Sequence, residues 1–282
     1  MKIAISVEST NDLSKEMLLS NDIKVIPFNI VLGDMMFKDG EKTTEEMFEY
    51  VDKNGTLPKT NAINEFEYTE YFNNILTEYD AVIHVALSSG ISSSCGNAFR
   101  AASNIKNAYI VDSKSLSTGI GLLALYAKEL ADKGEEAFEI TKKVQARADS
   151  LQVSFVVERL DYLHMGGRCS SVALLGANLF HIRPRIVVKD GKMTSDRKYK
   201  GSMEKVVSKY CKETLAEFNT PDLDKAFITY TTATEGMVER AEKALTEAGF
   251  RNIYKTRAGG TIASHCGGNT LGILYFNDGN KA

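Results

Sequence analysis

Residues 81–103 read AVIHVALSSGISSSCGNAFRAAS. A short apolar run comes first, then a loop rich in serine and glycine, and then a helical pattern. An apolar run of this length that is bounded by such a loop is typical of a buried strand. A strand followed by a helix is the repeating unit of an α/β fold with a parallel sheet. We therefore predict that Ala81–Ala86 is a strand of such a sheet.

The same alternation continues through the first half of the chain. Thr43 and Glu46 form the capping box of a helix that ends at Gly55. A second helix, at residues 115–134, is apolar over most of its circumference, which indicates that it is buried. Further strands are predicted at 2–7, 23–31, 107–111 and 153–157. This order predicts an α/β fold with a mainly parallel sheet and helices on both faces through about residue 150.

The pattern changes in the second half. Asp190 and Gly191 separate two short runs within residues 185–200, which is typical of a tight hairpin. Helices at 202–217 and 235–248 and strands at 226–230 and 271–276 complete an α+β half. A chain of 282 residues exceeds the usual size of a single core. We therefore predict two domains, residues 1–150 and 151–282, and a buried site between them is geometrically available.

Composition limits the classes of function. The 34 basic and 37 acidic residues give a net charge of −3 without long runs of one sign, which does not favour nucleic acid as a partner. The N-terminus lacks the apolar core of a signal peptide, and no segment has the length of apolar residues that a membrane span needs. We expect a cytoplasmic protein with no stable membrane insertion. Reduced thiols, rather than a zinc site or disulfides, are expected because the cysteines lie far apart, at Cys95, Cys169, Cys211 and Cys266.

The serine-rich loop is the first candidate site. Unpaired N–H groups at a helix N-terminus lie at the positive end of the helix dipole and stabilise a carboxylate or phosphate. Serines 92–94 can instead cap the following helix, which is their usual role at such a position. Because five serines fall within residues 88–94, we favour anion binding over capping alone.

Three other segments are candidates. Two glycines before Arg168 allow a turn toward an anion, although a glycine-capped helix end with a surface arginine is the favoured interpretation of this segment alone. Residues 176–188 favour core packing, and they would also suit an acyl tail and its head group. His265 lacks a second histidine or an acid at metal-ligand spacing, and a lone histidine is usually structural. Glycines at 259–260 and 267–268 nevertheless allow the backbone to approach a ligand closely.

Taken in order, these segments resemble the DegV family of fatty-acid-binding proteins, which includes the binding subunits of bacterial fatty acid kinase. The resemblance covers essentially the whole chain. It rests on STNDL at 9–13, PKTNAINEF at 58–66, LSSGISSSCGNA at 87–98, VDSKSLSTGIG at 111–121, LDYLHMGGR at 160–168, IRPRI at 182–186 and GGTIASHCGGNTLGILY at 259–275. It implies a two-domain fold with a long-chain fatty acid buried between the domains, and no cofactor.

The resemblance also implies which residues meet the ligand. The carboxylate is expected at Thr60, Ser92 and His265, with lesser contributions from Asn61, Ser93, Arg168 and Gly267. The protein itself is expected to perform no chemistry. It would present the carboxylate to a separate fatty acid kinase subunit, which uses ATP to make an acyl phosphate for phospholipid metabolism.

This chain departs from the family pattern at several positions. Glu8 stands where aspartate is usual, Ala62 and Ile63 replace Gln-Pro, and Ser93 replaces a glycine. These changes leave the expected carboxylate ligands in place and bear on chain length and on the surface that a kinase would recognise. Core filling is the expected role of the cysteines that neighbour the site motifs, which are Cys95, Cys169 and Cys266.

Two enzyme classes are the alternatives. A serine acyl hydrolase would use Ser92 as nucleophile and His265 as base, but the sequence has no G-x-S-x-G elbow and no evident acid to orient the histidine. A kinase in its own right would need a phosphate-binding loop, and no such pattern occurs in the chain. A binding protein is therefore favoured over both.

Overall fold

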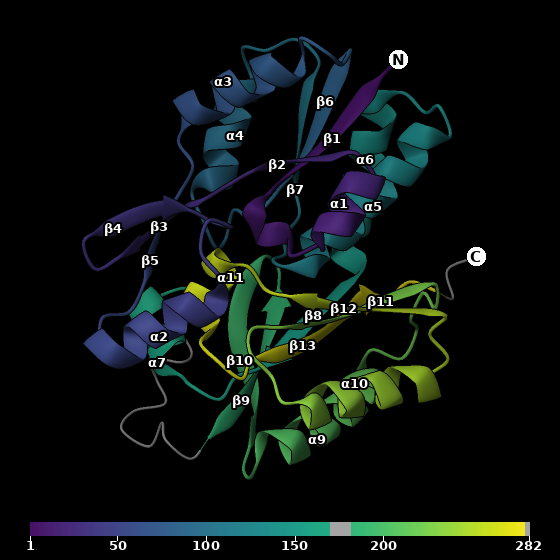
Figure 1. Ribbon diagram of the computed structural model, residues 1–282. Helices are drawn as coiled ribbons and strands as arrows, with labels where there is room; N and C mark the ends of the chain where they lie inside the picture. The colour runs from purple at the N-terminus through teal and green to yellow at the C-terminus, as the bar shows by residue number, and fades with distance from the viewer. Residues whose placement is uncertain (170–181, 280–282) are drawn as a thin grey trace.

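A four-stranded parallel sheet organises the N-terminal part of the chain (Figure 1). The computed structural model describes residues 1–169 and 182–279. In spatial order the strands are β2 (Ile23–Ile26), β1 (Ile3–Glu8), β6 (Ala81–Ala86) and β7 (Ala108–Asp112). Strand β6 is buried along its whole length, as its apolar run predicted.

Helices cover both faces of this sheet. Figure 1 shows α3 and α4 on one face and α5 and α6 on the other. The helices of this part are α1 (Lys15–Ser20), α3 (Glu65–Ile75), α4 (Ser94–Ala102), α5 (Thr118–Asp132) and α6 (Ala137–Arg147), with short 3-10 turns η1 (Ser9–Asn11) and η2 (Ala148–Ser150). The predicted α/β class is confirmed.

Residues 23–31, which were predicted as one strand, belong to two different sheets. The first piece is β2, and the second is β3 (Asn29–Leu32), which pairs antiparallel with β4 (Met35–Lys38) and β5 (Lys59–Asn61). Pro27 lies at the break and has no N–H to donate, so the hydrogen-bond ladder cannot continue through it. The prediction of a single strand was therefore wrong.

Helix α2 (Thr44–Asn54) begins at the predicted capping box. The Thr43 hydroxyl accepts the N–H of Glu46, and the Glu46 carboxylate accepts the N–H of Thr43. The helix ends at Gly55, whose φ of 69° places it in the left-handed region that favours glycine. Both predicted ends of this helix are confirmed.

The small sheet β3–β5 and helix α2 lie beside elements from the second half of the chain (Figure 1). Their apolar residues form a separate small core, in which Met47 and Val51 of α2 pack with Tyr162 of α7 (Asp161–Gly166). This contact brings the Thr60 strand, β5, near the elements that follow residue 150.

A six-stranded mixed sheet forms the second half. In spatial order its strands are β10 (Lys192–Tyr199), β9 (Arg183–Lys189), β8 (Leu151–Val156), β13 (Leu271–Phe276), β11 (Lys225–Tyr230) and β12 (Asn252–Arg257). The predicted hairpin is confirmed, because Asp190 and Gly191 join β9 to β10 with φ angles of 49° and 75°. Two helices, α9 (Met203–Glu217) and α10 (Glu235–Glu247), pack on each other beneath this sheet (Figure 1).

Helix α5 lies between the two large sheets (Figure 1). It contacts β1 and β6 on one side and β8 and β13 on the other, so ten of its 15 residues are buried. The packing is close: a Cβ placed on Gly119 would lie 2.9 Å from Val153 of β8. The predicted burial of this helix is confirmed, whereas the domain boundary at residue 150 stays a prediction.

The candidate segment 176–188 lies only partly within the described ranges, because its residues 176–181 fall outside them. Within the described part, Arg185 of β9 is buried and pairs with Asp196 and Glu217, so its charge is compensated by the protein. Among the helices described, none combines the length and the apolar composition needed to cross a membrane.

Candidate functional site

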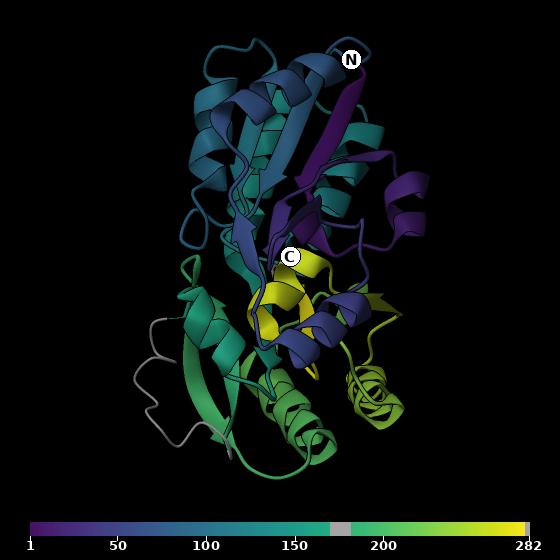
Figure 2. The same cartoon turned by 60° about the vertical axis from the view of Figure 1, so that its left-hand side comes forward.

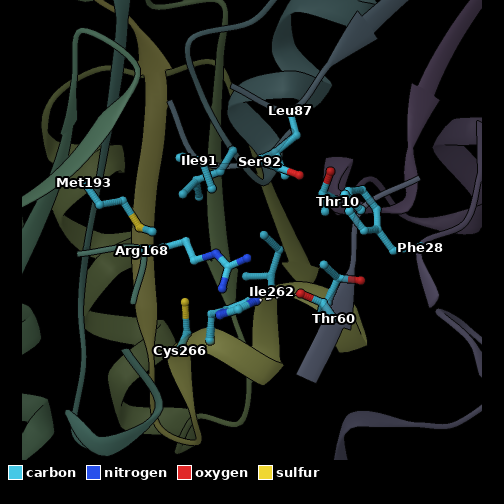
Figure 3. Close-up of a pocket in the computed structure, with 14 residues that line it drawn as sticks. Thr10, Phe28, Thr60, Leu87, Ile91, Ser92, Arg168, Met193, Ile262 and Cys266 are labelled. Atoms are coloured by element: carbon cyan, nitrogen blue, oxygen red, sulfur yellow. Dashed lines mark hydrogen bonds between the residues drawn. The ribbon is translucent and has the colours of Figure 1, made fainter. Parts of the chain in front are cut away.

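A narrow pocket lies where the two parts of the chain meet (Figure 3). Most of its wall is apolar and comes from Phe28, Leu87, Ile91, Leu116, Met193 and Ile262. A site of this kind suits a ligand with a long apolar part.

The structure brings the three expected carboxylate ligands to this one pocket. Thr60 comes from β5, Ser92 from the loop before α4, and His265 from α11 (Gly260–Cys266), the yellow helix at the middle of Figure 2. Arg168 also lines the pocket, from the turn after α7.

The remaining expected residues lie elsewhere. Asn61 and Ser93 are exposed, Gly267 is buried, and none of the three lines the pocket. A Cβ on Gly267 would lie 2.8 Å from the Tyr162 ring, and its φ is 71°, so packing and backbone conformation both call for glycine there.

Arg168 follows a glycine-capped helix end and also lines the pocket. Gly167 ends α7 in the left-handed region with a φ of 66°, as a glycine cap should. The Arg168 guanidinium is exposed and donates to the carbonyl of Gly166 at 2.6 Å. It also points into the mouth of the pocket (Figure 3), where its positive charge favours an anion.

His265 is held between Thr60 and Gly166. Its Nε2 lies 2.8 Å from the Thr60 Oγ1, and its Nδ1 faces Gly166, where a Cβ would lie only 2.4 Å away. Burial, together with the nearby Arg168 charge, lowers the pKa of His265 to about 4, so the ring is neutral at pH 7. In the tautomer with the proton on Nε2, His265 donates to Thr60 and leaves the Thr60 hydroxyl free to donate to a ligand.

The hydrogen bonds of Ser92 and His265 do not form the pair that an acyl hydrolase needs. The Ser92 hydroxyl accepts the N–H of Ser94 at 3.1 Å, while His265 is joined to Thr60. Within residues 1–169 and 182–279, no carboxylate hydrogen bonds to Nδ1 of His265. The capping role of the loop falls to Ser92, which supports the first turn of α4 and keeps its own proton available for a ligand.

Glu8 supports the serine-rich loop from beneath. Its buried carboxylate accepts the N–H of Leu87 and the hydroxyl of Tyr68, each at 2.8 Å. The Tyr68 hydroxyl in turn lies 2.7 Å from the Ser94 hydroxyl, at the start of α4. One carboxylate therefore fixes both ends of the loop that carries Ser92, a role that the sequence did not indicate.

Two further acidic side chains fix the start of α11, which carries His265. Asp12 accepts the N–H of Gly259 at 2.8 Å, and Asp39 accepts the N–H groups of Gly260 and Thr261 at 2.8 and 3.1 Å. A Cβ on Gly260 would lie 2.7 Å from Ile30 and 3.1 Å from Asp39, and one on Gly259 would lie 3.3 Å from Asp39. These glycines therefore make room for the small apolar core and for the acidic side chains that hold the start of α11.

The β9–β10 hairpin closes one side of the pocket. The Ser88 hydroxyl donates to the carbonyl of Gly191 at 2.7 Å, and a Cβ on Gly90 would lie 2.5 Å from the same oxygen. Figure 2 shows the tip of the hairpin beneath the serine-rich loop. Because Met193 of β10 lines the pocket, the hairpin forms a wall that is seated on the other half of the chain.

A second, smaller cavity adjoins the pocket. The two share Leu116, Ile262 and Cys266 as a common wall. The second cavity continues toward the six-stranded sheet, where Phe155 and Leu274 line it. The apolar space of the site therefore extends beyond the first pocket.

All four cysteines are buried. Cys266 lies in the common wall of the two cavities, and burial raises the pKa of its thiol to about 12. It is therefore a protonated, apolar wall residue at neutral pH. Over the described ranges, no group of three or more His, Cys, Asp or Glu side chains is arranged to hold a metal ion.

Comparison with known proteins confirms the family resemblance. Residues 2–278 match the family described as "Uncharacterised protein, DegV family". The chain is 26% identical over 279 residues to a DegV domain-containing protein of Caldanaerobacter subterraneus, covering 97% of this chain and 98% of that protein. It is 28% identical over 278 residues to one of Staphylococcus aureus, covering 98% and 99%.

Solved structures confirm the fold. DegV from Bacillus subtilis, a fatty acid binding protein, superposes with a TM-score of 0.86 at 26% identity, covering 98% of this chain and 99% of that one. A hypothetical protein from Thermotoga maritima, whose structure reveals fatty acid binding function, gives 0.83 at 27% identity with the same coverage. A DegV family protein from Thermus thermophilus gives 0.90 at 23% identity, also covering 98% and 99%, and shows the same fold.

Proposed function

Because the chain belongs to the DegV family, we propose that it binds a long-chain fatty acid, buries the acyl tail and holds the carboxylate at the polar end of the pocket. The observation that carries this proposal is the convergence of Thr60, Ser92 and Arg168 on a pocket with otherwise largely apolar walls (Figure 3). The fatty-acid-binding relatives from Bacillus subtilis and Thermotoga maritima support it.

The polar end of the pocket suits a carboxylate. A carboxylate that leaves water needs hydrogen-bond donors or an opposite charge to replace its hydration. The Thr60 and Ser92 hydroxyls would donate to it, and the Arg168 guanidinium would attract it at the mouth. His265 would act mainly through Thr60, by keeping that hydroxyl aimed at the ligand.

The apolar space suits the tail. Burying a methylene group stabilises a complex by about 0.8 kcal/mol, so a sixteen-carbon chain gains on the order of 10 kcal/mol before the costs of binding. We place the tail in the first pocket and, past Leu116, Ile262 and Cys266, in the second cavity. A gain of this size would keep the fatty acid bound during purification.

We infer further that the protein leaves the fatty acid unchanged and presents its carboxylate to a separate cytoplasmic fatty acid kinase subunit. The family resemblance supports this step. The separate hydrogen bonds of Ser92 and His265 favour binding over acyl hydrolysis.

Native mass spectrometry of the purified protein tests the proposal first, followed by extraction of the lipid under denaturing conditions. We expect one intact fatty acid for each chain. After delipidation, Thr60→Val and Ser92→Ala should each raise the Kd for hexadecanoic acid about 10- to 150-fold, because each removes a hydrogen bond to a charged group worth about 1.5–3 kcal/mol. Ser103→Ala is the control, since this exposed hydroxyl bonds only the nearby carbonyl of Arg100.

Two results would contradict parts of the proposal. A protein that purifies empty and hydrolyses a chromogenic ester, with Ser92→Ala abolishing turnover, would be a hydrolase. A fatty acid complex that yields no acyl phosphate with ATP and a fatty acid kinase catalytic subunit would keep the binding function and remove the kinase partner.

A further inference from the structure

Two threonine hydroxyls in the pocket wall lack a protein partner. Thr10 is fully buried and Thr261 is 4% exposed, and both line the pocket. Among the residues that the structure describes, neither hydroxyl makes a hydrogen bond. Leaving a buried hydroxyl unpaired costs folding free energy, whereas valine has the same shape and no such cost. Two unpaired hydroxyls in one pocket therefore point to a polar atom of the ligand.

Thr261 lies one helical turn from the head-group end. It belongs to the first turn of α11, four residues before His265, and side chains at this spacing lie on the same face, with Cβ atoms about 5–6 Å apart. Its backbone N–H is already bound by Asp39, so the hydroxyl has no part in capping the helix.

Thr10 comes from η1, an element that contacts α11. In Figure 3 its hydroxyl lies at the level of the Ser92 hydroxyl, on the opposite side of the picture from Arg168. Apolar side chains, Phe28 and Ile262, line the pocket with it. A polar ligand atom at Thr10 and Thr261 therefore lies close to the head group and is flanked by apolar side chains.

A plain fatty acid leaves these hydroxyls without a partner. Its two carboxylate oxygens have Thr60, Ser92 and Arg168 as donors, and its tail offers no polar atom. A hydroxyl on one of the first carbons after the carboxyl group would lie where Thr10 and Thr261 can reach it. Each threonine can donate a hydrogen bond to such a group or accept one from it.

We propose that the preferred ligand is a fatty acid hydroxylated next to its carboxyl end, at carbon 2 or carbon 3, and that Thr10 and Thr261 hold this hydroxyl. The proposal rests on the fatty-acid-binding function proposed above. It adds the chemical class of the ligand and two binding residues to that function.

Titration of the delipidated full chain with hexadecanoic, 2-hydroxyhexadecanoic and 3-hydroxyhexadecanoic acid tests the proposal. We expect one hydroxy acid to bind about tenfold more tightly than hexadecanoic acid, since it adds one or two hydrogen bonds in a buried site. Thr10→Val and Thr261→Val should remove this preference for the hydroxy acid over hexadecanoic acid. Thr261→Ser should keep the preference, because it keeps the hydroxyl.

Thr69→Val is the matched control, because its hydroxyl bonds the carbonyl of Glu65 on an outer face of α3. Equal binding of all three acids by the wild-type protein would overturn the proposal, as would a preference that survives in both valine variants. The wild-type protein could show no preference for a hydroxy acid while the valine variants bind hexadecanoic acid more tightly. This result would also overturn the proposal, and it would mean that the two hydroxyls bind water. If none of the three acids binds, the fatty-acid-binding function itself fails.

Discussion

Replacing Gly166 by alanine tests whether the position of the His265 ring sets the affinity for the carboxylate. A Cβ at Gly166 would lie 2.4 Å from Nδ1, and ordinary contact begins at 3.4 Å, so the two atoms must separate by about 1 Å. The ring cannot shift toward Thr60, because Nε2 already lies at a normal hydrogen-bond distance of 2.8 Å from the Thr60 hydroxyl. We expect the ring to rotate away and the bond to break.

Without its bond to His265, the Thr60 hydroxyl is no longer aimed at the ligand. The expected loss of affinity is therefore that of the hydrogen bond from Thr60 to the carboxylate. One hydrogen bond to a charged group is worth about 1.5–3 kcal/mol, so the Kd for hexadecanoic acid should rise about 10- to 150-fold. Stability should change less, because alanine is favoured over glycine in a helix by about 1 kcal/mol, which offsets part of the clash. The backbone at Gly166 lies outside the left-handed region, so it accepts alanine without strain.

Isothermal titration calorimetry of the delipidated protein measures this change. Gly96→Ala is the matched control, since the nearest atom to a Cβ there, Nη1 of Arg100, is at 3.6 Å. A wild-type Kd in Gly166→Ala, together with shifted NMR signals of the His265 ring, would refute the link from His265 through Thr60 to the ligand. Unshifted ring signals and an unchanged Tm would instead refute the close packing of Gly166 on His265.

Three other perturbations probe the supports of the site. Gly90→Ala should raise the off-rate of the fatty acid in stopped-flow displacement, because its Cβ would lie 2.5 Å from the Gly191 carbonyl and push the β9–β10 hairpin away from the pocket. An unchanged off-rate would contradict a closing role for the hairpin. The contribution of His265 to the free energy of unfolding should fall as pH drops from about 6.5 to about 4, because the unfolded chain binds a proton at His265 that the folded state, with a pKa of about 4, does not; the same pH dependence of the urea-derived free energy of unfolding in wild type and His265→Asn would argue against this. Burial raises the pKa of Asp12 to about 8, so the folded state keeps a proton that the unfolded chain loses, and the contribution of Asp12 should fall as pH rises from about 4 to 8, which opposes the His265 contribution between about 4 and 6.5; Asp12→Asn should remove the Asp12 contribution, and an identical profile would show that Asp12 is ionised when folded.

Local chemistry made several elements predictable from the sequence. The capping box at Thr43 and the turn at Asp190-Gly191 each depend on a few neighbouring residues, and both form as predicted. The prediction of one strand at 23–31 was wrong because the apolar pattern continues across Pro27, whereas the hydrogen bonds between strands cannot continue there. Periodicity records which side chains are buried, but not which sheet a strand joins.

The site was less accessible to sequence reasoning than the fold. Thr60 and His265 are 205 positions apart, and only the family resemblance brought them together before the structure did. Glu8 and Asp39 act on backbone N–H groups of distant segments, and such bonds leave no pattern along the chain. Thr10 resembles any small polar residue in a loop, and only its burial without a partner marks it.

The place of β13 in the second sheet has a consequence for how the protein is made. Residues 271–276 fill the middle of that sheet, between β8 and β11. Until they are in place, the strands on either side form two separate ribbons, in which the edges of β8 and β11 that face each other are open to pairing with other chains. A nascent chain interrupted before Leu271 would therefore expose two edges that β13 covers in the complete sheet.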